Sequence, residues 1–205
     1  EQGYGLTETV GPVVMLRPED HMDDQKMLSC GKAVPGVKIR VVKADGQDCA
    51  IGDVGEIIVF SVQVMNGYWN RPDDTADTIR DGWLHTGDAG YFDSEGYLYI
   101  HDRLKDMIVS GAENVYPAEV ERVLTEYPGI ADVAVIGVPD KRWGEAVKAL
   151  VVAKPDATLI EKDIIEYTRM HIARFKCPKS VDIVDSIPRN PSGKILKKQL
   201  REPYW

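Results

Sequence analysis

Two nearly uninterrupted apolar runs in the second half of the chain constrain its fold most. Val133–Val138 and Ala146–Ala153 each hold mostly aliphatic residues, and only a short stretch with polar residues and glycine separates them. Strands that read as continuous apolar runs, rather than as alternating ones, are typical of a sheet covered on both faces. The sequence therefore predicts a compact unit in which other segments shield this pair of strands on each side.

Helix and strand signals surround these two runs. Pro117 occupies the favoured first position of a helix, which Pro128-Gly129 ends. Thr158 and Glu161 have the spacing of a capping box and predict the start of a second helix. The stretch Val181-Asp-Ile-Val184, rich in β-branched residues, predicts a last strand. Residues 105–205 are thus expected to form a small α+β domain with a short hairpin and about three strands flanked by helices.

The first half of the chain has a β pattern instead. Val37–Val42 and Glu56–Phe60 are β-branched runs bracketed by turn residues, and Asp93–Gly96 has the length and final glycine of a hairpin connection. Short strands at close spacing indicate a small barrel or sandwich. A short strand, Met107–Val109, then begins a different pattern, so the domain boundary is predicted near Lys105.

Composition excludes several classes of protein. The 205 residues carry a net charge of −8, which argues against general nucleic-acid binding. No apolar run approaches the ~20 residues that span a bilayer, and no signal peptide is visible. Three widely spaced cysteines predict free thiols in a reducing cytoplasm, and the four histidines lack zinc-site spacing. The stretch from Arg169 to the end contains nine Lys/Arg and only three Asp/Glu, which indicates a surface for polyanions or a solvated basic tail.

One lysine stands out within that basic stretch. Pro188–Leu200 places Lys194 on a loop stiffened by Pro188 and Pro191 and loosened by Gly193. The stretch is not a Walker loop, because a phosphate-binding P-loop needs a glycine in place of Pro188 and a hydroxyl residue directly after the lysine. A lysine held in this way is a point charge that can be brought to an anion.

Three other segments give this loop a context. Together with the Lys194 loop, they resemble, in chain order, the motifs of adenylate-forming enzymes: Tyr4–Glu8, Thr86–Asp88, Asp102–Pro117 and Pro188–Leu200. Gly67–Pro72 lies between the first two of these segments. That superfamily includes acyl-CoA synthetases, 4-coumarate–CoA ligases, luciferase and peptide-synthetase adenylation domains. The resemblance extends from residue 1 to about residue 201. It implies that residues 1–104 form the end of the large AMP-binding domain, as a distorted β-barrel, and that residues 105–205 form its small mobile C-terminal domain.

The resemblance also implies a reaction. An ATP-dependent ligase activates a carboxylic acid, expected to be fatty or related, as an acyl-adenylate, and then transfers it to coenzyme A. ATP, Mg²⁺, coenzyme A and the acid are the expected ligands. Lys194 is the expected catalytic residue, since its ammonium would offset the charges of the carboxylate and the α-phosphate.

The first motif supplies four expected nucleotide contacts. The resemblance implies that the Tyr4 ring lies against adenine and that Gly5 allows close backbone approach. The Thr7 hydroxyl is expected to bond a phosphate oxygen. The Glu8 carboxylate is expected to hold Mg²⁺, a hard ion that prefers oxygen ligands. Thr7 and Glu8 are therefore counted with Lys194 among the catalytic residues.

Two further motif residues are expected at the ribose. Asp88 offers a carboxylate for both ribose hydroxyls, and Arg103 offers fixed donors for ribose or phosphate oxygens. The plainer alternatives are a turn residue for Asp88 and a surface ion pair with Asp102 or Asp106 for Arg103. Lys105 lies where the resemblance places the hinge of a domain rotation between the two half-reactions.

The expected coenzyme A site lies in the second domain. Ser110 and Gly111 match the loop along which the pantetheine arm passes, although Ala112 stands where the family commonly has a second glycine. Trp143 and Phe175 are aromatic residues beside basic ones. They either stack on the coenzyme A adenine or pack within the domain, and the sequence leaves both interpretations open.

Two alternatives to a CoA ligase remain open. One is an adenylation domain that loads a carrier protein, and the other is a folded fragment that acts only as a binding module. The chain begins inside a motif, so a missing N-terminal portion of the same enzyme is an expected partner, and the 205 residues alone are expected to be inactive. The expected location is the cytoplasm, with peripheral attachment to a membrane left open.

Overall fold

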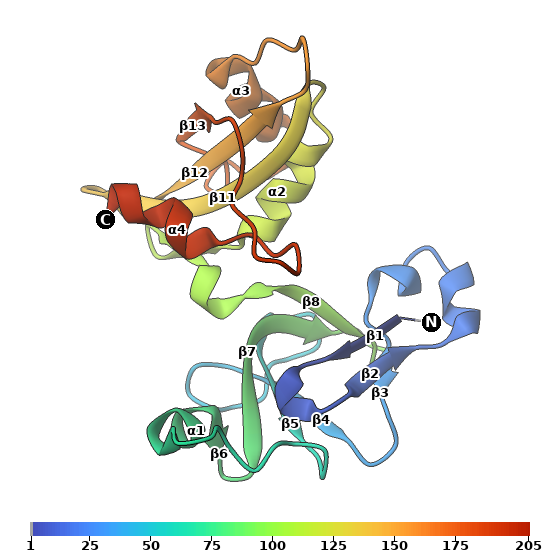
Figure 1. Cartoon of the computed structure of the whole chain (residues 1–205). Helices are drawn as coiled ribbons and strands as arrows, with labels where there is room; N and C mark the ends of the chain where they lie inside the picture. Colours follow the sequence, from blue (N-terminus) through green and yellow to red (C-terminus); the bar gives the residue numbers. More distant parts are fainter. Residues whose placement is uncertain (1) are drawn as a thin grey trace. The chain divides into compact units, whose positions relative to one another are not determined.

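The structure, a computed structural model, describes residues 2–205 and divides the chain into two compact units, Glu1–Leu104 and Lys105–Trp205. Glu1 itself lies outside the described residues. The α+β class predicted from the sequence is confirmed, because curled sheets and helices build the units (Figure 1).

The first unit contains two antiparallel sheets. The smaller sheet has the order β1-β2-β3, and the larger has the order β4-β5-β7-β6, with β8 also paired to β7. The strands are β1 (Gln2–Gly5), β2 (Pro12–Leu16), β3 (Lys32–Ala33), β4 (Lys38–Val42), β5 (Gly55–Phe60), β6 (Ile79–Arg80), β7 (Trp83–Phe92) and β8 (Leu98–Arg103). The predicted strands at 37–42 and 56–60 are thus confirmed as the paired β4 and β5.

One apolar core joins the two sheets of the first unit. A backbone bridge between Gly31 and Leu98 links them. Both sheets contribute fully buried residues to the core: Val13, Val14, Ile57, Val59 and Leu98. Helix α1 (Pro72–Thr78) and three 3-10 turns complete this unit: η1 (Thr7–Thr9), η2 (Pro18–Met22) and η3 (Lys26–Leu28).

The predicted hairpin connection at residues 93–96 is confirmed as the turn between β7 and β8. The Asp93 carboxylate accepts the backbone amides of Glu95 and Tyr97, at 2.9 and 2.8 Å. Gly96 has a φ of +81°, which glycine adopts without steric cost. A side-chain acceptor and a glycine thus close the turn, as the sequence indicates.

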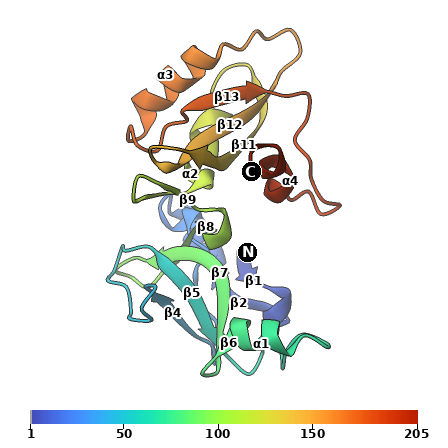
Figure 2. The ribbon, with the colours of Figure 1, turned by 90° about the vertical axis from the view of Figure 1, so that its left-hand side faces the viewer.

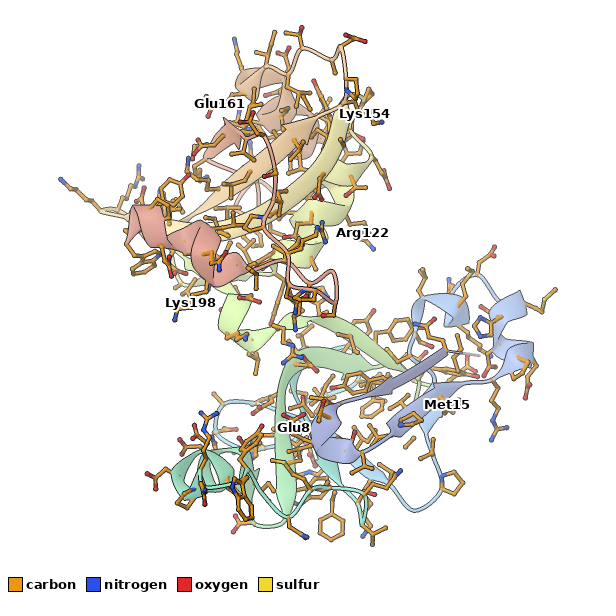
Figure 3. The ribbon with its side chains drawn as sticks, viewed as in Figure 1. Glu8, Met15, Arg122, Lys154, Glu161 and Lys198 are labelled. Carbon is orange, nitrogen blue, oxygen red and sulfur yellow. The ribbon has the colours of Figure 1, made fainter. Side chains whose placement is uncertain are left out.

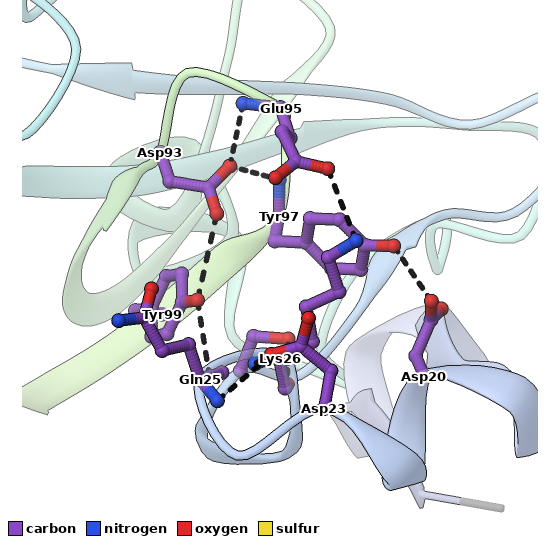
Figure 4. A network of polar contacts seen from close by, with 9 residues as sticks. Asp20, Asp23, Gln25, Lys26, Asp93, Glu95, Tyr97 and Tyr99 are labelled. Carbon is purple, nitrogen blue, oxygen red and sulfur yellow. Dashed lines mark hydrogen bonds and ion pairs between the residues drawn. The ribbon is translucent and has the colours of Figure 1, made fainter.

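Polar contacts fasten the long connection between β2 and β3 to this turn (Figure 4). The Tyr97 hydroxyl donates to Asp20 at 2.7 Å, and the Lys26 ammonium lies 3.1 Å from Glu95. The ammonium groups of Lys26 and Lys32 also lie over the Tyr97 ring. These hydrogen bonds and cation–π contacts order a segment that exposes most of its own apolar side chains.

The second unit is a five-stranded sheet with the order β10-β9-β12-β11, and β13 pairs with β12 in parallel. Its strands are β9 (Ile108–Ser110), β10 (Glu113–Val115), β11 (Ile130–Asp140), β12 (Gly144–Ala153) and β13 (Ser180–Ile183). Its helical segments are α2 (Pro117–Thr125), α3 (Glu161–His171), α4 (Lys197–Arg201) and the 3-10 turn η5 (Glu202–Tyr204), and the turn η4 (Leu104–Asp106) starts at the boundary. Figure 2 shows β13, β12 and β11 side by side.

Both faces of the β11–β12 pair are covered, as its apolar pattern predicts. On one face, α2 and α3 pack against the strands in a single buried core. On the other face, Ile187 and Leu200 of the C-terminal segment pack against Ala134, Ile136 and Leu150. In Figure 1, α4 and the red C-terminal segment lie on the opposite side of β11 from α2.

The predicted capping box at Thr158 is wrong. Helix α3 begins at Glu161, Ile160 is its cap residue, and no side chain caps it. The Glu161 carboxylate instead accepts the backbone amide of Val181 on β13 at 2.9 Å (Figure 3 shows Glu161 at the start of α3). A tertiary hydrogen bond to a strand has thus replaced the local one that the spacing suggested.

A polar triad fixes the C-terminus to the sheet. Lys148 of β12 is buried, and its ammonium donates to Asp182 of β13 at 2.6 Å, while the Tyr204 hydroxyl donates to the other carboxylate oxygen. Burial alone would raise the pKa of Asp182, but the hydrogen bonds from Lys148 and Tyr204 outweigh it and lower that pKa. Burial and the bond to Asp182 raise the pKa of Tyr204 to about 12.

This triad predicts a pH-dependent stability. Because the pKa of Asp182 is lower in the folded state, its contribution is complete above the unfolded value of about 4 and is lost as the pH falls through the folded value. Asp182→Asn should therefore cost about 1–2 kcal/mol at pH 7, since Asp182 is partly exposed, and much less near pH 2. Urea unfolding at both pH values measures this. Asp185→Asn, at an exposed neighbouring carboxylate, is the control, and an equal loss at both pH values would contradict the prediction.

Candidate functional site

The first unit holds a cavity of about 540 Å³ to which several predicted motifs contribute. Gly5, Thr7 and Glu8 of the first motif line it, as do Thr86 and Arg103 of two others. These residues come from β1, η1, β7 and β8, so the fold brings together segments that lie far apart in the sequence. The remaining predicted nucleotide residues of this unit, Tyr4 and Asp88, are buried.

Asp88 connects Tyr4 to Arg103. Its carboxylate accepts the Tyr4 hydroxyl at 2.7 Å and pairs with Arg103 Nε at 2.7 Å. Burial, followed by the negative charge of Asp88, raises the pKa of the Tyr4 phenol, so Tyr4 remains a hydrogen-bond donor. Asp88 and Arg103 also face each other in the register of β7 and β8. Each carboxylate oxygen has a second lone pair that can accept a further donor.

The turn that presents Asp88 is fixed by its neighbours. The buried Thr86 hydroxyl donates to the Ile57 carbonyl and accepts the Asp88 amide. The Glu56 carboxylate accepts the amide of Gly87 at 3.2 Å. Gly87 has a φ of +70°, which other residues rarely adopt, and this explains the glycine of Thr86-Gly-Asp88.

Glu8 lies at the edge of the cavity with one carboxylate oxygen already in use. The Tyr68 hydroxyl donates to Glu8 Oε1 at 2.7 Å, and this bond raises the pKa of Tyr68 (Figure 3 shows Glu8 on η1). Tyr68 also lines the cavity, although the sequence analysis gave it no role. The signal that could have found it is its place in the Gly67–Pro72 motif.

The residues present fit Mg²⁺ only at a site that a bound nucleotide completes with ligands of its own. No cluster of three or more metal-ligating side chains occurs in the part of the chain that the structure describes. Mg²⁺ is commonly held by one or two carboxylates together with substrate phosphates. The remaining oxygen of Glu8 suits that arrangement, with the nucleotide supplying the other ligands.

Close packing explains Gly5, and a hydroxyl fixes the neighbouring turn. A Cβ on Gly5 would lie 2.4 Å from the Gly11 carbonyl oxygen, so this residue lets β1 and β2 approach. The Thr9 hydroxyl accepts the Leu6 amide, and its one proton can go to the Leu6 or the Gly11 carbonyl, at 2.9 and 2.8 Å, which fixes η1. Thr7 itself is exposed and lines the cavity. Sequence reasoning did not single out Thr9.

In the second unit, Lys194 is exposed on a loop whose backbone is held firmly. The Asn190 side-chain oxygen accepts the Lys194 amide at 2.8 Å. Arg189 donates to the Gly193 carbonyl and, through its other terminal nitrogen, to both oxygens of Asp132 on β11. A backbone held by side-chain hydrogen bonds thus presents an exposed ammonium.

The predicted hinge residue lies near this loop. A cavity of about 430 Å³ is lined by Lys105 and Asp106 together with residues 194–198 and Arg201. Lys105 is exposed, like Lys194. Lys105 and Lys194 both belong to the second unit, so the fold of that unit alone places them at the same cavity.

Three of the predicted coenzyme A residues meet at one turn. Gly111 and Ala112, with φ of +62° and +69°, form the turn of the β9–β10 hairpin, which Ser110 begins. The Gly111 amide donates to the Trp143 carbonyl, and a Cβ on Gly111 would lie 2.6 Å from the Trp143 ring. Trp143 therefore packs against the hairpin while 40% of it stays exposed, with the Arg142 guanidinium 4.5 Å from its ring centre.

Ser110 and Phe175 differ in their exposure. Ser110 is buried at the end of β9, whereas Phe175 is 40% exposed in the loop before β13. The neighbouring Lys176 pairs with Glu119 of α2 through both carboxylate oxygens. Phe175 thus keeps an accessible surface on a loop that an ion pair ties down.

The three cysteines are free thiols. Burial raises the pKa of Cys30, Cys49 and Cys177, which disfavours the thiolate needed for nucleophilic chemistry. Among the described residues, no helix has the length and apolar character required to cross a bilayer.

Comparison with known proteins agrees with these motifs. The family description "AMP-binding enzyme" matches residues 1–69, and "AMP-binding enzyme C-terminal domain" matches residues 119–194. The chain belongs to the AMP-binding, adenylate-forming enzymes. The match to the second description covers most of α2, the strands β11 to β13 and Lys194.

Individual relatives are similar along the whole chain. A fatty acid–[acyl-carrier-protein] ligase from Streptomyces coeruleorubidus is 46% identical over 205 residues, which are 100% of this chain and 40% of that protein. A long-chain-fatty-acid–CoA ligase from Mycobacterium tuberculosis is 49% identical over 203 residues, which are 99% of this chain and 40% of that protein. The chain thus spans about 40% of the length of these relatives.

A solved structure shows the same fold. The o-succinylbenzoate CoA synthetase of Bacillus subtilis, in complex with its acyl-adenylate intermediate, has a TM-score of 0.89 and 41% identity. The similarity covers 97% of this chain and 40% of that one. The same synthetase, in complex with ATP and a magnesium ion, has a TM-score of 0.87 and 40% identity over the same shares of both chains.

The hairpin turn gives a matched pair of stability predictions. Ala112→Gly should stabilise the chain by about 0.5–1 kcal/mol, because alanine is strained at a φ of +69°. Gly111→Ala should destabilise it by about 1–3 kcal/mol, because the added methyl group meets both this strain and the Trp143 ring. Chemical denaturation measures both variants. Changes of the same sign in the two variants would contradict the assigned turn geometry.

Proposed function

We propose that the chain contributes the nucleotide-binding edge and the mobile catalytic domain of an ATP-dependent acyl-CoA ligase. Residues 1–104 would complete the AMP-binding domain, and residues 105–205 would form the small domain that rotates. The observation that carries this proposal is Lys194, an exposed ammonium on a backbone fixed by Asn190 and Arg189. Its motif context and the family membership of the chain support the assignment.

In the first half-reaction, a carboxylate oxygen attacks the α-phosphorus of ATP, and the bond to pyrophosphate breaks. Two anionic groups approach each other, so positive charge that is already in place lowers the barrier most. The Lys194 ammonium would lie against both groups. Its rigid loop limits the entropy lost when the ammonium meets them.

The first unit would hold the nucleotide for this attack. Asp88 and Arg103 would bond the ribose hydroxyls, and the Tyr4 phenol, fixed by Asp88, would border the adenine. Thr7 would bond a phosphate oxygen. Glu8, with one oxygen already hydrogen-bonded, would share Mg²⁺ with the phosphates, and that ion would neutralise part of their charge when bound.

In the second half-reaction, a thiol sulfur attacks the acyl carbon, and AMP leaves. Rotation about the hinge at Lys105 would replace the Lys194 loop with the Ser110-Gly111 turn. The exposed faces of Trp143 and Phe175, each beside a basic residue, suit the adenine and phosphates of coenzyme A.

The acceptor has one specific alternative. The relative from Streptomyces coeruleorubidus bears the name of an acyl-carrier-protein ligase, and its identity of 46% is close to that of the CoA ligase at 49%. A carrier-bound thiol presents the same pantetheine arm to the hairpin turn. Fatty or related acids are the proposed substrates, and the cytoplasm is the proposed location. ATP–pyrophosphate exchange over a panel of acids is the measurement that identifies the acid.

The decisive experiment separates the two half-reactions. In a ligase that contains this chain, Lys194→Ala should lower the rate of adenylate formation by about two to three orders of magnitude, because one preorganised electrostatic donor is lost. The same variant, supplied with preformed acyl-adenylate, should form the thioester at nearly the parental rate. Quenched assays of each step measure the two rates. Loss of both steps together would refute the proposed alternation.

Lys198→Ala is the matched control for this experiment. Lys198 is exposed on α4, four residues from Lys194 (Figure 3). Lys197 is unsuitable, because its ammonium forms a largely buried ion pair with Glu121 at 2.8 Å, and its removal would disturb the fold. A loss in Lys198→Ala as large as in Lys194→Ala would assign the effect to the whole basic tail.

A second experiment tests the ribose assignment. Asp88→Ala should raise the KM for ATP and weaken AMP binding by at least about 10-fold, because each hydrogen bond to a charged acceptor contributes about 1.5–3 kcal/mol. Calorimetry measures the AMP affinity. Asp45→Ala, at an exposed carboxylate of the same unit, is the control for nonspecific charge loss. Unchanged AMP affinity in a folded Asp88→Ala protein would disprove the assignment.

A further inference from the structure

The boundary between the two units is held on each side by one arginine. Arg103 ends β8, pairs in register with Asp88 and forms an ion pair with that buried carboxylate at 2.7 Å. This contact lies entirely within the first unit. The backbone of the first unit is therefore fixed up to Arg103.

Arg201 provides the corresponding contact within the second unit. Its two terminal nitrogens donate to the carbonyls of Lys105 and Asp106, each at 3.2 Å, and one of them lies 3.4 Å from the Asp106 carboxylate. The helix that carries Arg201 is itself anchored, because Leu200 is buried against the sheet and Lys197 pairs with a glutamate of α2. The chain from the Lys105 carbonyl onward is thus part of the rigid second unit.

We infer that Arg201 is a positioning residue that confines the pivot between the two units to the backbone torsions of Leu104 and Lys105. The torsions between the fixed Arg103 backbone and the fixed Lys105 carbonyl, at the start of the short turn η4, are then the ones that change in a rotation. When only a few backbone torsions can change, the second unit can adopt only a few orientations. A longer free segment would let it sample many. This inference rests on the domain rotation of the proposed function.

Arg201 also links the pivot to the catalytic loop. Helix α4 begins three residues after Lys194, and the same cavity is lined by Lys105, Lys194 and Arg201. A guanidinium suits this role because its planar fork offers each carbonyl a separate nitrogen in fixed geometry, whereas an ammonium has its three donors on one nitrogen. The contacts are to main-chain oxygens, so they are independent of which side chain occupies the hinge position.

Hydrogen exchange of the 205-residue chain, followed by mass spectrometry, tests the clamp directly. Arg201→Ala should speed exchange of the amides at residues 104–107 by about tenfold, because two charge-assisted hydrogen bonds are lost. Exchange in the centre of β11 should not change. Arg201→Lys keeps the charge and much of the packing. The amides at residues 104–107 should still exchange rapidly in this variant, so the prediction can be tested even if the alanine variant unfolds. Arg169→Ala, which removes an exposed arginine paired with Glu166, should have no effect at residues 104–107.

The catalytic consequence is measured in a ligase that contains this chain. Arg201→Ala should lower kcat at least about fivefold while the KM for ATP stays within about twofold, because the proposed nucleotide residues lie in the first unit. Unchanged exchange at residues 104–107, full protection in Arg201→Lys, or an unchanged kcat would each overturn the inference. The exchange result does not depend on any reaction, so failure of the proposed function and failure of the clamp are distinguishable.

Discussion

The structure of the second unit depends on the need to cover both faces of β11 and β12. Helices α2 and α3 cover one face, and the C-terminal stretch from Val184 onward packs against the other. Burial of apolar surface contributes about 25 cal/mol per Å², so docking of this stretch is strongly favoured. Because Lys194 lies within that stretch, the packing of the sheet also determines where the proposed catalytic ammonium is presented.

In the first unit, a buried carboxylate has the corresponding role. Asp88 is 5% exposed, and an unpaired charge at such a site would be costly. Tyr4 and Arg103 satisfy it, and in doing so they tie β1 to β7 and β8. Three motifs that are far apart in the sequence thus meet at one buried charge, and Thr7 and Glu8 of the first motif line the neighbouring cavity.

Sequence alone predicted the elements with a strong local signal and named several residues that line the cavity of the first unit, but not the tertiary contacts. The continuous apolar runs became β11 and β12. The prediction failed at Thr158, where a hydrogen bond to β13 replaces the local cap. The motifs named Asp88 and Arg103, yet their pairing follows from the β7–β8 register, which no local pattern specifies. Tyr68 was missed because its hydroxyl acts on Glu8 across the fold rather than at a fixed spacing.

The basic C-terminal stretch shows most clearly what a charge count leaves undetermined. Five of its nine cationic residues form ion pairs within the second unit: Arg169, Lys176, Arg189, Lys197 and Arg201. Their partners come from α2, α3, β11 and η4, so most of these pairs serve to dock the tail. Lys194 is different, because it is exposed and its loop is held by backbone contacts rather than by its own charge. Among the paired cations, Arg189 holds the loop to β11, and the Lys194 ammonium stays exposed, as its proposed role requires.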